Sequence, residues 1–339
     1  MKFIVTGGLG FIGINLVHRL IRDDHQVFIV DNLSSRGRLM GFENPLVKET
    51  IGDIKLIPSR KLSYKYHSGV IVIGDVAEKD TWSSLPLCSD VEGIFHIAGR
   101  LGNEASLKDP SADARTNIFG TIKTLDFALE NHINKFVITN SICSWESQED
   151  GVLFTETKGV IPESPYGLSK LVCGEYALLY HRLFGLQVSV AKLFNIYGPG
   201  DTVGDNNANV IPLWITKASR DEDLIVTGPD GIRDYIYVDD VVEILLRAMD
   251  TPTNCMFNVG SGEGCNSLDL AKMIKEAVGS SSKITIGEPR KWDAINHRVA
   301  DISLMKELLR YHPETPIDVG IDDTVYWWDL FKILGRNMI

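Results

Sequence analysis

Residues 2–13 read KFIVTGGLGFIG, and this stretch decides the first part of the fold. Residues 2–6 form a short apolar run with the length and composition of a buried strand. Residues 11–22 have the apolar spacing of a helix. Four glycines fill the turn and the helix start between them: Gly7, Gly8, Gly10 and Gly13. The segment therefore predicts a strand, a tight turn and a helix in direct succession.

The same alternation continues to about Asn195 and predicts an α/β protein with a doubly wound parallel sheet. The expected strands are 2–6, 26–30, 70–73, 93–97, 135–139 and 187–193, and the expected helices are 11–22, 112–131 and 166–184. After Asn195 the sequence turns to loops rich in Gly, Pro and Asn with shorter elements. This change predicts a second, smaller α/β lobe.

Composition narrows the class of protein. The net charge of −11 argues against a surface that coats nucleic acid, because such a surface needs a basic stripe. No apolar run reaches the roughly 18 residues of a membrane span, and the first residues lack a signal peptide's longer apolar region.

The five cysteines are scattered without CxxC spacing, so we expect reduced thiols, no metal site and a cytoplasmic protein. Residues 41–69 are polar and basic and fit no clear element, which favours a solvated insertion over a partner site.

The glycine-rich turn predicts a dinucleotide site. Glycine there allows a tight turn, a close approach of the backbone to a pyrophosphate, and close packing of helix on sheet. Such turns also occur merely to shape a loop, but this one lies between a strand and a helix. Asp31 follows about 20 residues later at the end of the second strand, as the pattern requires. An aspartate there accepts hydrogen bonds from ribose hydroxyls and repels a 2′-phosphate, so NAD is favoured over NADP, although the nearby Arg36 is a counter-signal.

Tyr166 and Lys170 are the candidate proton-transfer pair. They are four residues apart at the start of a helix that Pro165 begins, so both lie on one face. A nearby ammonium and a positive nicotinamide would favour the phenolate and make Tyr166 a usable base. The spacing alone is common and a surface pair is the alternative. Here Ser141, in the turn after the strand 135–139, could donate to the reacting oxygen.

At this point the chain resembles the extended short-chain dehydrogenase/reductases, specifically the NAD-dependent nucleotide-sugar epimerase/dehydratase family with its UDP-glucose 4-epimerase-like members. The motifs occur in order along nearly the whole chain. They are TGGLGFIG (6–13), DNL (31–33), GDV (74–76), HIAG (96–99), Asn117, ESPYGLSK (163–170), LFNIYGPG (193–200), RDYIYVDDVVEIL (233–245), FNVGSGEG (257–264) and VADIS (299–303).

The resemblance implies a role for each matching residue. Ser141, Tyr166 and Lys170 would be catalytic. NAD would contact Gly7, Gly10, Phe11, Ile12, Asp31, Asn32, Asp75, Val76, Ile97, Ala98, Gly99 and Asn117, together with Tyr166 and Lys170. From the residues alone, Asp75 could accept from the adenine amino group or cap a helix at 77–85. The nucleotide sugar would contact Asn195, Asn209, Val210, Arg233, Arg290 and Arg298, and arginine forks suit phosphate oxygens.

The resemblance also implies an organisation. Residues 1–192 plus about 234–260 would form the NAD-binding Rossmann domain, and about 193–233 with 261–339 the nucleotide-sugar-binding domain. The helices 112–131 and 166–184 would pair across a two-fold axis in a homodimer, although their apolar residues could equally pack on the protein's own sheet.

Four positions depart from the family pattern. Trp145 stands where the family has tyrosine, and Lys192 stands where arginine is frequent. Dehydratases of the family place Asp-Glu directly after the catalytic hydroxyl residue, and decarboxylases place Glu in the second position. Ile142 and Cys143 occupy those positions here.

Without an acid and a base to expel water, the minimal reaction is inversion at C4 of a nucleotide-activated hexose, most simply a UDP-sugar, through a 4-keto intermediate. Another reaction of the family (a reductase, a decarboxylase, an epimerase at another carbon, or a dehydratase that uses Cys143) is the first alternative. A non-catalytic NAD-binding scaffold is the second.

Overall fold

The structure, a computed structural model, describes residues 1–34, 55–56, 63–86, 90–144, 151–156, 162–201, 209–288 and 297–336. Internal contacts divide the chain into two units. Unit 1 comprises Met1–Glu146, Gly159–Lys192 and Val242–Phe257, and unit 2 comprises Ser147–Lys158, Leu193–Val241 and Asn258–Ile339.

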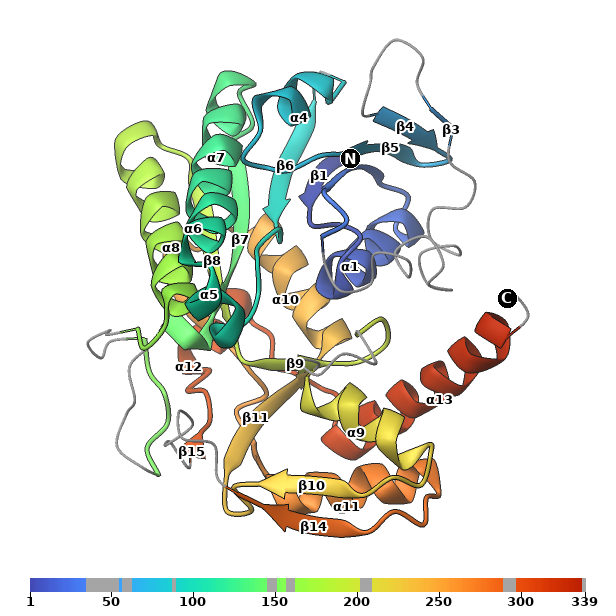
Figure 1. Ribbon diagram of the computed structural model, residues 1–339. Coiled ribbons are helices and arrows are strands. Elements are labelled where there is room, and N and C mark those ends of the chain that lie inside the picture. The colour runs from blue at the N-terminus through green and yellow to red at the C-terminus, as the bar shows by residue number, and fades with distance from the viewer. Residues whose placement is uncertain are drawn as a thin grey trace. The chain divides into compact units, whose positions relative to one another are not determined.

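Unit 1 is built on a nine-stranded sheet with the order β12-β8-β7-β6-β1-β2-β5-β4-β3 (Figure 1). The strands are β1 (Lys2–Thr6), β2 (Gln26–Asp31), β3 (Lys55–Leu56), β4 (Ser63–Tyr66), β5 (Gly69–Ile73), β6 (Val91–His96), β7 (Lys135–Ser141), β8 (Gln187–Leu193) and β12 (Met256–Val259). The central strand β1 pairs in parallel with both neighbours, and Thr6 lies opposite Val30 and His96. The predicted doubly wound α/β class is confirmed.

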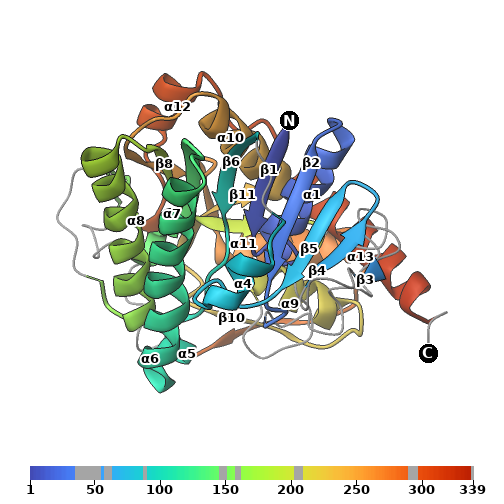
Figure 2. The same cartoon turned by 90° about the horizontal axis from the view of Figure 1, so that it is seen from above.

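Helices cover both faces of this sheet, as a doubly wound fold requires. They are α1 (Phe11–Arg22), α4 (Lys79–Ser84), α5 (Asn103–Lys108), α6 (Pro110–Ala114), the π-helical η1 (Arg115–Phe119), α7 (Gly120–Glu130), the 3₁₀ turn η2 (Ile142–Ser144), α8 (Pro165–Phe184) and part of α10 (Val238–Asp250). Figure 2 shows α7 and α8 on one face and α1 on the other. Ser164 begins α8 because its hydroxyl accepts from the Gly167 amide, and Gly185 ends it in the left-handed conformation.

Two sequence expectations for unit 1 were wrong in detail. The single helix expected at 112–131 is α6, η1 and α7 in succession. The wider π turn forms where Asn117 bonds to the backbone of Arg100 and to Ser169, which are contacts that helical periodicity cannot reveal. Part of the insertion expected at 41–69 is strand, since β4 pairs antiparallel with β5 and buried Tyr66 donates to the carbonyl oxygen of Val27. Most of residues 41–62 lies outside the described part of the chain.

Unit 2 has two small sheets and four helices of its own among the described residues. Its elements are β9 (Asn195–Tyr197), α9 (Val210–Ala218), β10 (Leu224–Thr227), β11 (Ile232–Tyr237), β13 (Gly264–Asn266), α11 (Ser267–Val278), β14 (Ile284–Gly287), β15 (His297–Arg298), α12 (Ser303–Leu309) and α13 (Ile317–Arg336). β10 pairs with β14, while β11 pairs with β13, β15 and β9. Helices α9, α11 and α13 enclose an apolar core that includes Trp214, Leu270 and Ile321. In the described residues of both units, no helix is long and apolar enough to cross a membrane.

Asp234 on β11 ties three segments of unit 2 together. One carboxylate oxygen accepts from the amide and hydroxyl of Ser261 at 2.7 and 2.8 Å. The other accepts from the amides of Gly262 and Ala300 at 3.0 and 3.1 Å. The side chain has no exposed surface, so these bonds replace its hydration. Asp234 thereby fixes the strand from which its neighbour Arg233 projects.

We predict that Asp234→Asn lowers the free energy of unfolding by about 3 kcal/mol, because an amide NH₂ would face backbone N–H donors in a dry site. Urea unfolding followed by circular dichroism measures this loss. The exposed Asp230 on the preceding turn provides the control, and Asp230→Asn should change stability by less than about 0.5 kcal/mol. Equal unfolding midpoints for the two variants would contradict this account of Asp234.

Candidate active site

The turn between β1 and α1 has the shape that a diphosphate needs. Gly7 has φ +69°, and a Cβ there would lie 2.7 Å from the backbone nitrogen of Ala98. A Cβ at Gly13 would overlap the carbonyl oxygen of Gly7. Gly10 caps α1 without a side chain, so the amides of Phe11 and Ile12 have no acceptor within the helix and remain available to an anion. These backbone positions fit the pyrophosphate of a dinucleotide.

Asp31 lies at the end of β2 and is almost fully buried. Its two oxygens accept from the amides of Leu9 at 2.9 Å and Leu33 at 2.8 Å, which leaves each oxygen further acceptor capacity. Burial raises the pKa of this carboxyl, and the two amide bonds oppose the rise. The carboxylate is thus held on the glycine turn, in the geometry expected of a ribose acceptor.

Asn32 and Asp75, which are 43 residues apart in the chain, meet at the ends of β2 and β5. The amide nitrogen of Asn32 donates to Asp75 Oδ2 at 3.1 Å. The other oxygen of Asp75 accepts from the Ala77 amide, while Glu78 occupies the N-cap of α4. Asp75 is therefore not the helix cap, and the helix expected at 77–85 is shorter. Val76 is buried in the core beside these polar groups.

The residues after β6 bring the cofactor candidates close to Lys170. Ala98 donates its amide to the hydroxyl of Thr6 at 3.2 Å, while Ile97 bonds to the Thr6 backbone. A Cβ at Gly99 would lie 3.2 Å from Asn117 Oδ1 and 3.5 Å from Lys170 Nζ. Ile97, Ala98 and Gly99 are partly accessible, whereas Asn117 is buried.

His96, the last residue of β6, is buried and bonds to two hydroxyl groups. Its ring nitrogens lie 2.8 Å from the hydroxyl of Thr6 and 3.0 Å from that of Thr121. Burial, with a smaller contribution from the charge of Lys170, lowers the pKa of His96 to about 3. The imidazole is therefore neutral in the working range and holds two hydroxyl groups in place.

Ser141, Tyr166 and Lys170 come together at the end of β7 and the start of α8. The phenol of Tyr166 is hydrogen-bonded to Ser141. The ammonium of Lys170 donates to the carbonyl oxygen of Thr139 at 2.7 Å, and Asn140 donates to the backbone oxygen of Lys170 at 2.8 Å. The sequence had predicted that these three side chains lie close together, and their catalytic roles stay predictions.

Burial is the main influence on the pKa values of this pair in the protein without its cofactor. Burial, with the nearby Cys143 thiol as the next cause, raises the pKa of Tyr166, and the bond to Ser141 opposes the rise only in part. Burial also lowers the pKa of Lys170. The expectation that this ammonium and a bound nicotinamide together favour the phenolate concerns the enzyme with its cofactor and stays a prediction.

Helix α5 carries residues that sequence reasoning missed. The hydroxyl of Ser106 accepts from the Tyr166 amide at 3.0 Å and donates to the backbone oxygen of Asn103 at 2.7 Å. The side chain of Asn103 accepts from Ser164 at 2.8 Å and has its amide nitrogen 3.8 Å from the sulfur of Cys143. These bonds fix the first turn of α8, and no local pattern in the sequence marks them.

The candidate substrate residues lie in unit 2. Arg233 and Arg298 are register partners on the parallel strands β11 and β15, so their side chains leave the sheet on one face. Asn195 donates to the backbone oxygen of Asp234 at 2.8 Å. Asn209 is the N-cap residue of α9 and Val210 its first residue. Arg290 and Trp145 lie outside the described residues.

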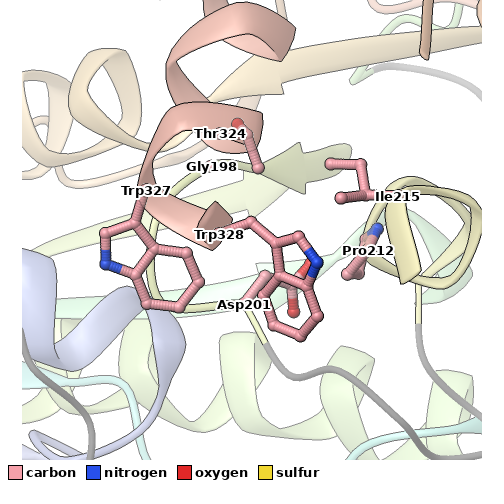
Figure 3. A pocket seen from close by; sticks show the side chains of 7 residues that line it. All are labelled: Gly198, Asp201, Pro212, Ile215, Thr324, Trp327 and Trp328. Atoms are coloured by element: carbon pink, nitrogen blue, oxygen red, sulfur yellow. The ribbon is translucent and has the colours of Figure 1, made fainter. Parts of the chain in front are cut away.

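A small cavity of unit 2 lies next to Asn209, whose side-chain amide donates to the lining residue Asp201 at 3.1 Å. Figure 3 shows Asp201, Trp327 and Trp328 around it, and the space open to the centre of a water molecule is about 10 Å³, roughly the room that one water needs. Pockets for ligands of drug size hold roughly 300–1,000 Å³. The cavity is therefore too small for a nucleotide sugar. In the described part of the chain, no group of three or more His, Cys, Asp or Glu side chains could hold a metal ion.

A doubly wound sheet whose first turn is a glycine-rich anion cradle defines a dinucleotide-binding protein of the Rossmann type. A model of the NAD dependent epimerase/dehydratase family matches residues 3–260. The chain belongs to this family, and its cofactor is NAD. The resemblance inferred from the motifs is thereby confirmed.

Individual relatives differ in their reactions. Over 327 residues the chain is 31% identical to the UDP-glucose 4-epimerase of Mycolicibacterium smegmatis, with 96% of this chain and 97% of that protein covered. Over 340 residues it is 30% identical to the UDP-N-acetyl-alpha-D-glucosaminuronate decarboxylase of Bacillus cytotoxicus, with the same coverage. The solved structure of UDP-glucose 4-epimerase from Thermotoga maritima with UDP-glucose matches with a TM-score of 0.84 and 28% identity, and the match covers 97% of this chain and 99% of that chain.

We predict that Asp31 makes the protein prefer NAD over NADP by about tenfold or more in Kd, because a 2′-phosphate would approach a buried carboxylate. Calorimetric titration of cofactor-stripped protein with each dinucleotide measures the ratio. Asp31→Asn should reduce the ratio of the NADP and NAD dissociation constants. Asp80→Asn, which removes an exposed carboxylate on α4, should leave this ratio unchanged. Equal or tighter binding of NADP by the unmodified protein would reject the assignment.

Proposed function

We propose that the protein is a nucleotide-hexose 4-epimerase that inverts C4 of a UDP-sugar through a 4-keto intermediate. One observation carries the proposal: the turn after Ser141 presents Ile142 and Cys143 beside Tyr166, and neither is a carboxylic acid. Elimination of water from the 4-keto sugar needs an acid and a base beside the ketone. Without them, return of the hydrogen to C4 is the simplest fate of the intermediate.

The three residues at the start of α8 and the end of β7 would share the chemistry. Tyr166 would take the proton of the 4-hydroxyl group, and Ser141 would donate to the same oxygen. Lys170 would favour the phenolate by its charge. NAD, when bound, supplies the acceptor and the donor for the hydrogen on C4. The residues of unit 1 named above would hold it, from Gly7 and Asp31 to Asn117.

Unit 2 would hold the nucleotide diphosphate. Arg233 and Arg298 offer two guanidinium groups on one face of a sheet, which suits a diphosphate in geometry and charge. Arg290 would complete this clamp, with Asn195, Asn209 and Val210 at the nucleoside. The names of the Mycolicibacterium and Thermotoga relatives support uracil as the base.

A second reaction within the family is supported by the Bacillus relative, whose name is that of a decarboxylase. A dehydratase or reductase with Cys143 as the additional proton donor is a further alternative, because this thiol lies next to Tyr166. A scaffold that binds NAD without turnover is the third. Products distinguish them, since only an epimerase gives an isomer of its substrate, and the position of the inverted carbon separates C4 from an epimerase at another carbon.

The test is incubation of the purified protein with UDP-, dTDP-, GDP- and CDP-hexoses, with chromatographic resolution and mass analysis of the products. We expect an isomeric UDP-hexose and no accumulation of NADH. With substrate deuterated at C4, the epimer should keep its deuterium. Loss of the label to solvent, or a product lighter by water or carbon dioxide, would replace the epimerase by one of the alternatives.

Tyr166→Phe is the matched inactive variant for this assay, because it removes one oxygen from a packed ring. It should retain NAD and UDP-sugar affinity while kcat falls by about 10²-fold or more. Turnover near that of the unmodified protein would assign the proton transfer to another group, with Cys143 the nearest candidate.

We also propose a homodimer in the cytoplasm. Large apolar side chains are exposed on η1 and α8, namely Phe119, Leu168, Leu183 and Phe184, each 51–63% accessible. Cys143, Cys173, Cys255 and Cys265 are free thiols, which suits a reducing compartment. Light scattering at micromolar concentration should give twice the chain mass, and Leu183→Glu with Phe184→Glu should give the monomer. Ile225→Glu, an equally exposed site on β10, should remain dimeric.

A further inference from the structure

Asp113 on α6 is a buried carboxylate that the proposed reaction does not use. Its side chain is 1% exposed and lies between α6 and α8, which pack against each other. One oxygen, Oδ2, lies 2.5 Å from the hydroxyl of Ser169 on α8. The other, Oδ1, is buried without a hydrogen-bond partner among the residues that the structure describes. The tendency of this segment to form a helix does not explain a buried carboxylate at position 113.

A buried carboxylate with an unpartnered oxygen is costly unless positive charge lies near it. Two cations act on Asp113, namely Lys170, which directly follows Ser169, and Arg100, which also lies 3.8 Å from Asp109. Burial raises the pKa of Asp113, whereas the bond from Ser169, both cations and hydrogen bonding from the Asn117 side chain oppose the rise. The carboxylate and the ammonium of Lys170 therefore support each other's charged forms.

The described groups around Lys170 leave Asp113 as its source of negative charge. They are Tyr166 and Cys173 on α8, His96 on β6, Asp113 on α6 and the carbonyl oxygen of Thr139. The imidazole is neutral, and burial raises the pKa of the Cys173 thiol and of the Tyr166 phenol. In the neutral range none of these three carries a negative charge. Arg100 also acts on Asp113 and adds only positive charge.

We propose that Asp113 is a positioning residue of the Tyr166–Lys170 pair, whose buried negative charge keeps the ammonium of Lys170 charged inside unit 1. Ser169 holds the carboxylate in place, and it also accepts from Asn117 at 2.9 Å. The π turn η1 thereby connects the cofactor candidate Asn117 with the residue beside Lys170. The inference rests on the proposed role of this pair, although the ionisation of Lys170 can be measured without any substrate.

The test uses Asp113→Asn, which removes the charge but keeps the size and an oxygen that can accept from Ser169. The protonation of Lys170 is followed by the ¹³Cε resonance of lysine-labelled protein with its cofactor. The peak absent from Lys170→Met identifies it. We expect the midpoint of this titration to fall by about one pH unit in Asp113→Asn. In the dependence of kcat on pH, the apparent pKa of the basic limb should fall by the same amount, while KM stays nearly unchanged.

Two further variants separate charge from structure. Asp113→Glu keeps the charge and should titrate near the unmodified protein. Asp126→Asn removes a similar carboxylate–hydroxyl bond from the same side of the sheet, 2.6 Å from Tyr180 to Asp126, and should leave Lys170 unchanged. An unchanged midpoint in Asp113→Asn, or an equal shift in Asp126→Asn, overturns the inference. If none of the nucleotide sugars gave an isomeric product, the proposed epimerase would be rejected. The titration of Lys170 would still decide the role of Asp113.

Discussion

The hydrogen bond from Lys170 to the carbonyl oxygen of Thr139 sets the arrangement of the rest of the site. It carries an ammonium group into the interior of unit 1, where burial favours the neutral amine. The interior must then supply an acceptor at the end of β7 and a negative charge from α6. Asn140 bonds to the backbone of the same residue, so the start of α8 is fixed against β7 from two sides. Tyr166 lies one turn earlier on α8, so these bonds also fix its position.

Close packing makes this arrangement possible. A Cβ at Gly167 would overlap the carbonyl oxygen of Cys143, so the first turn of α8 can touch η2 only with glycine at this place. Ser106 then reaches the Tyr166 amide from α5, and Ser164 caps the helix. The first turn of α8, which carries the candidate base Tyr166, is thus fixed by contacts to its backbone from η2, from α5 and from Ser164.

The parts of the structure that the sequence predicts are those with local causes. The strand β1, the glycine turn and α1 follow from apolar spacing and the need for small residues, and α8 follows from Ser164, Pro165 and its apolar period. The break of the helix at η1 depends on Asn117 meeting Arg100 and Ser169, which no period encodes. The burial of Tyr166 and Lys170 was not predicted for a similar reason. The spacing of a tyrosine and a lysine shows which charges can meet, but not how much water surrounds them. Asp113 lay within a predicted helix and showed its role only when α8 was placed beside it.

The fold and the Tyr–Lys pair do not choose the reaction, because a 4-epimerase and a decarboxylase are equally similar to this chain. The choice must come from groups that meet the 4-keto sugar after oxidation. In η2 the amide of Cys143 donates to the Ser141 hydroxyl at 3.2 Å, and its sulfur faces the Asn103 amide nitrogen. Thiols in general are weaker acids than carboxyl groups and supply the proton that expels water less readily. This turn therefore supports the proposed epimerase, in which the hydride returns to C4 from the opposite face of the sugar and no water is expelled.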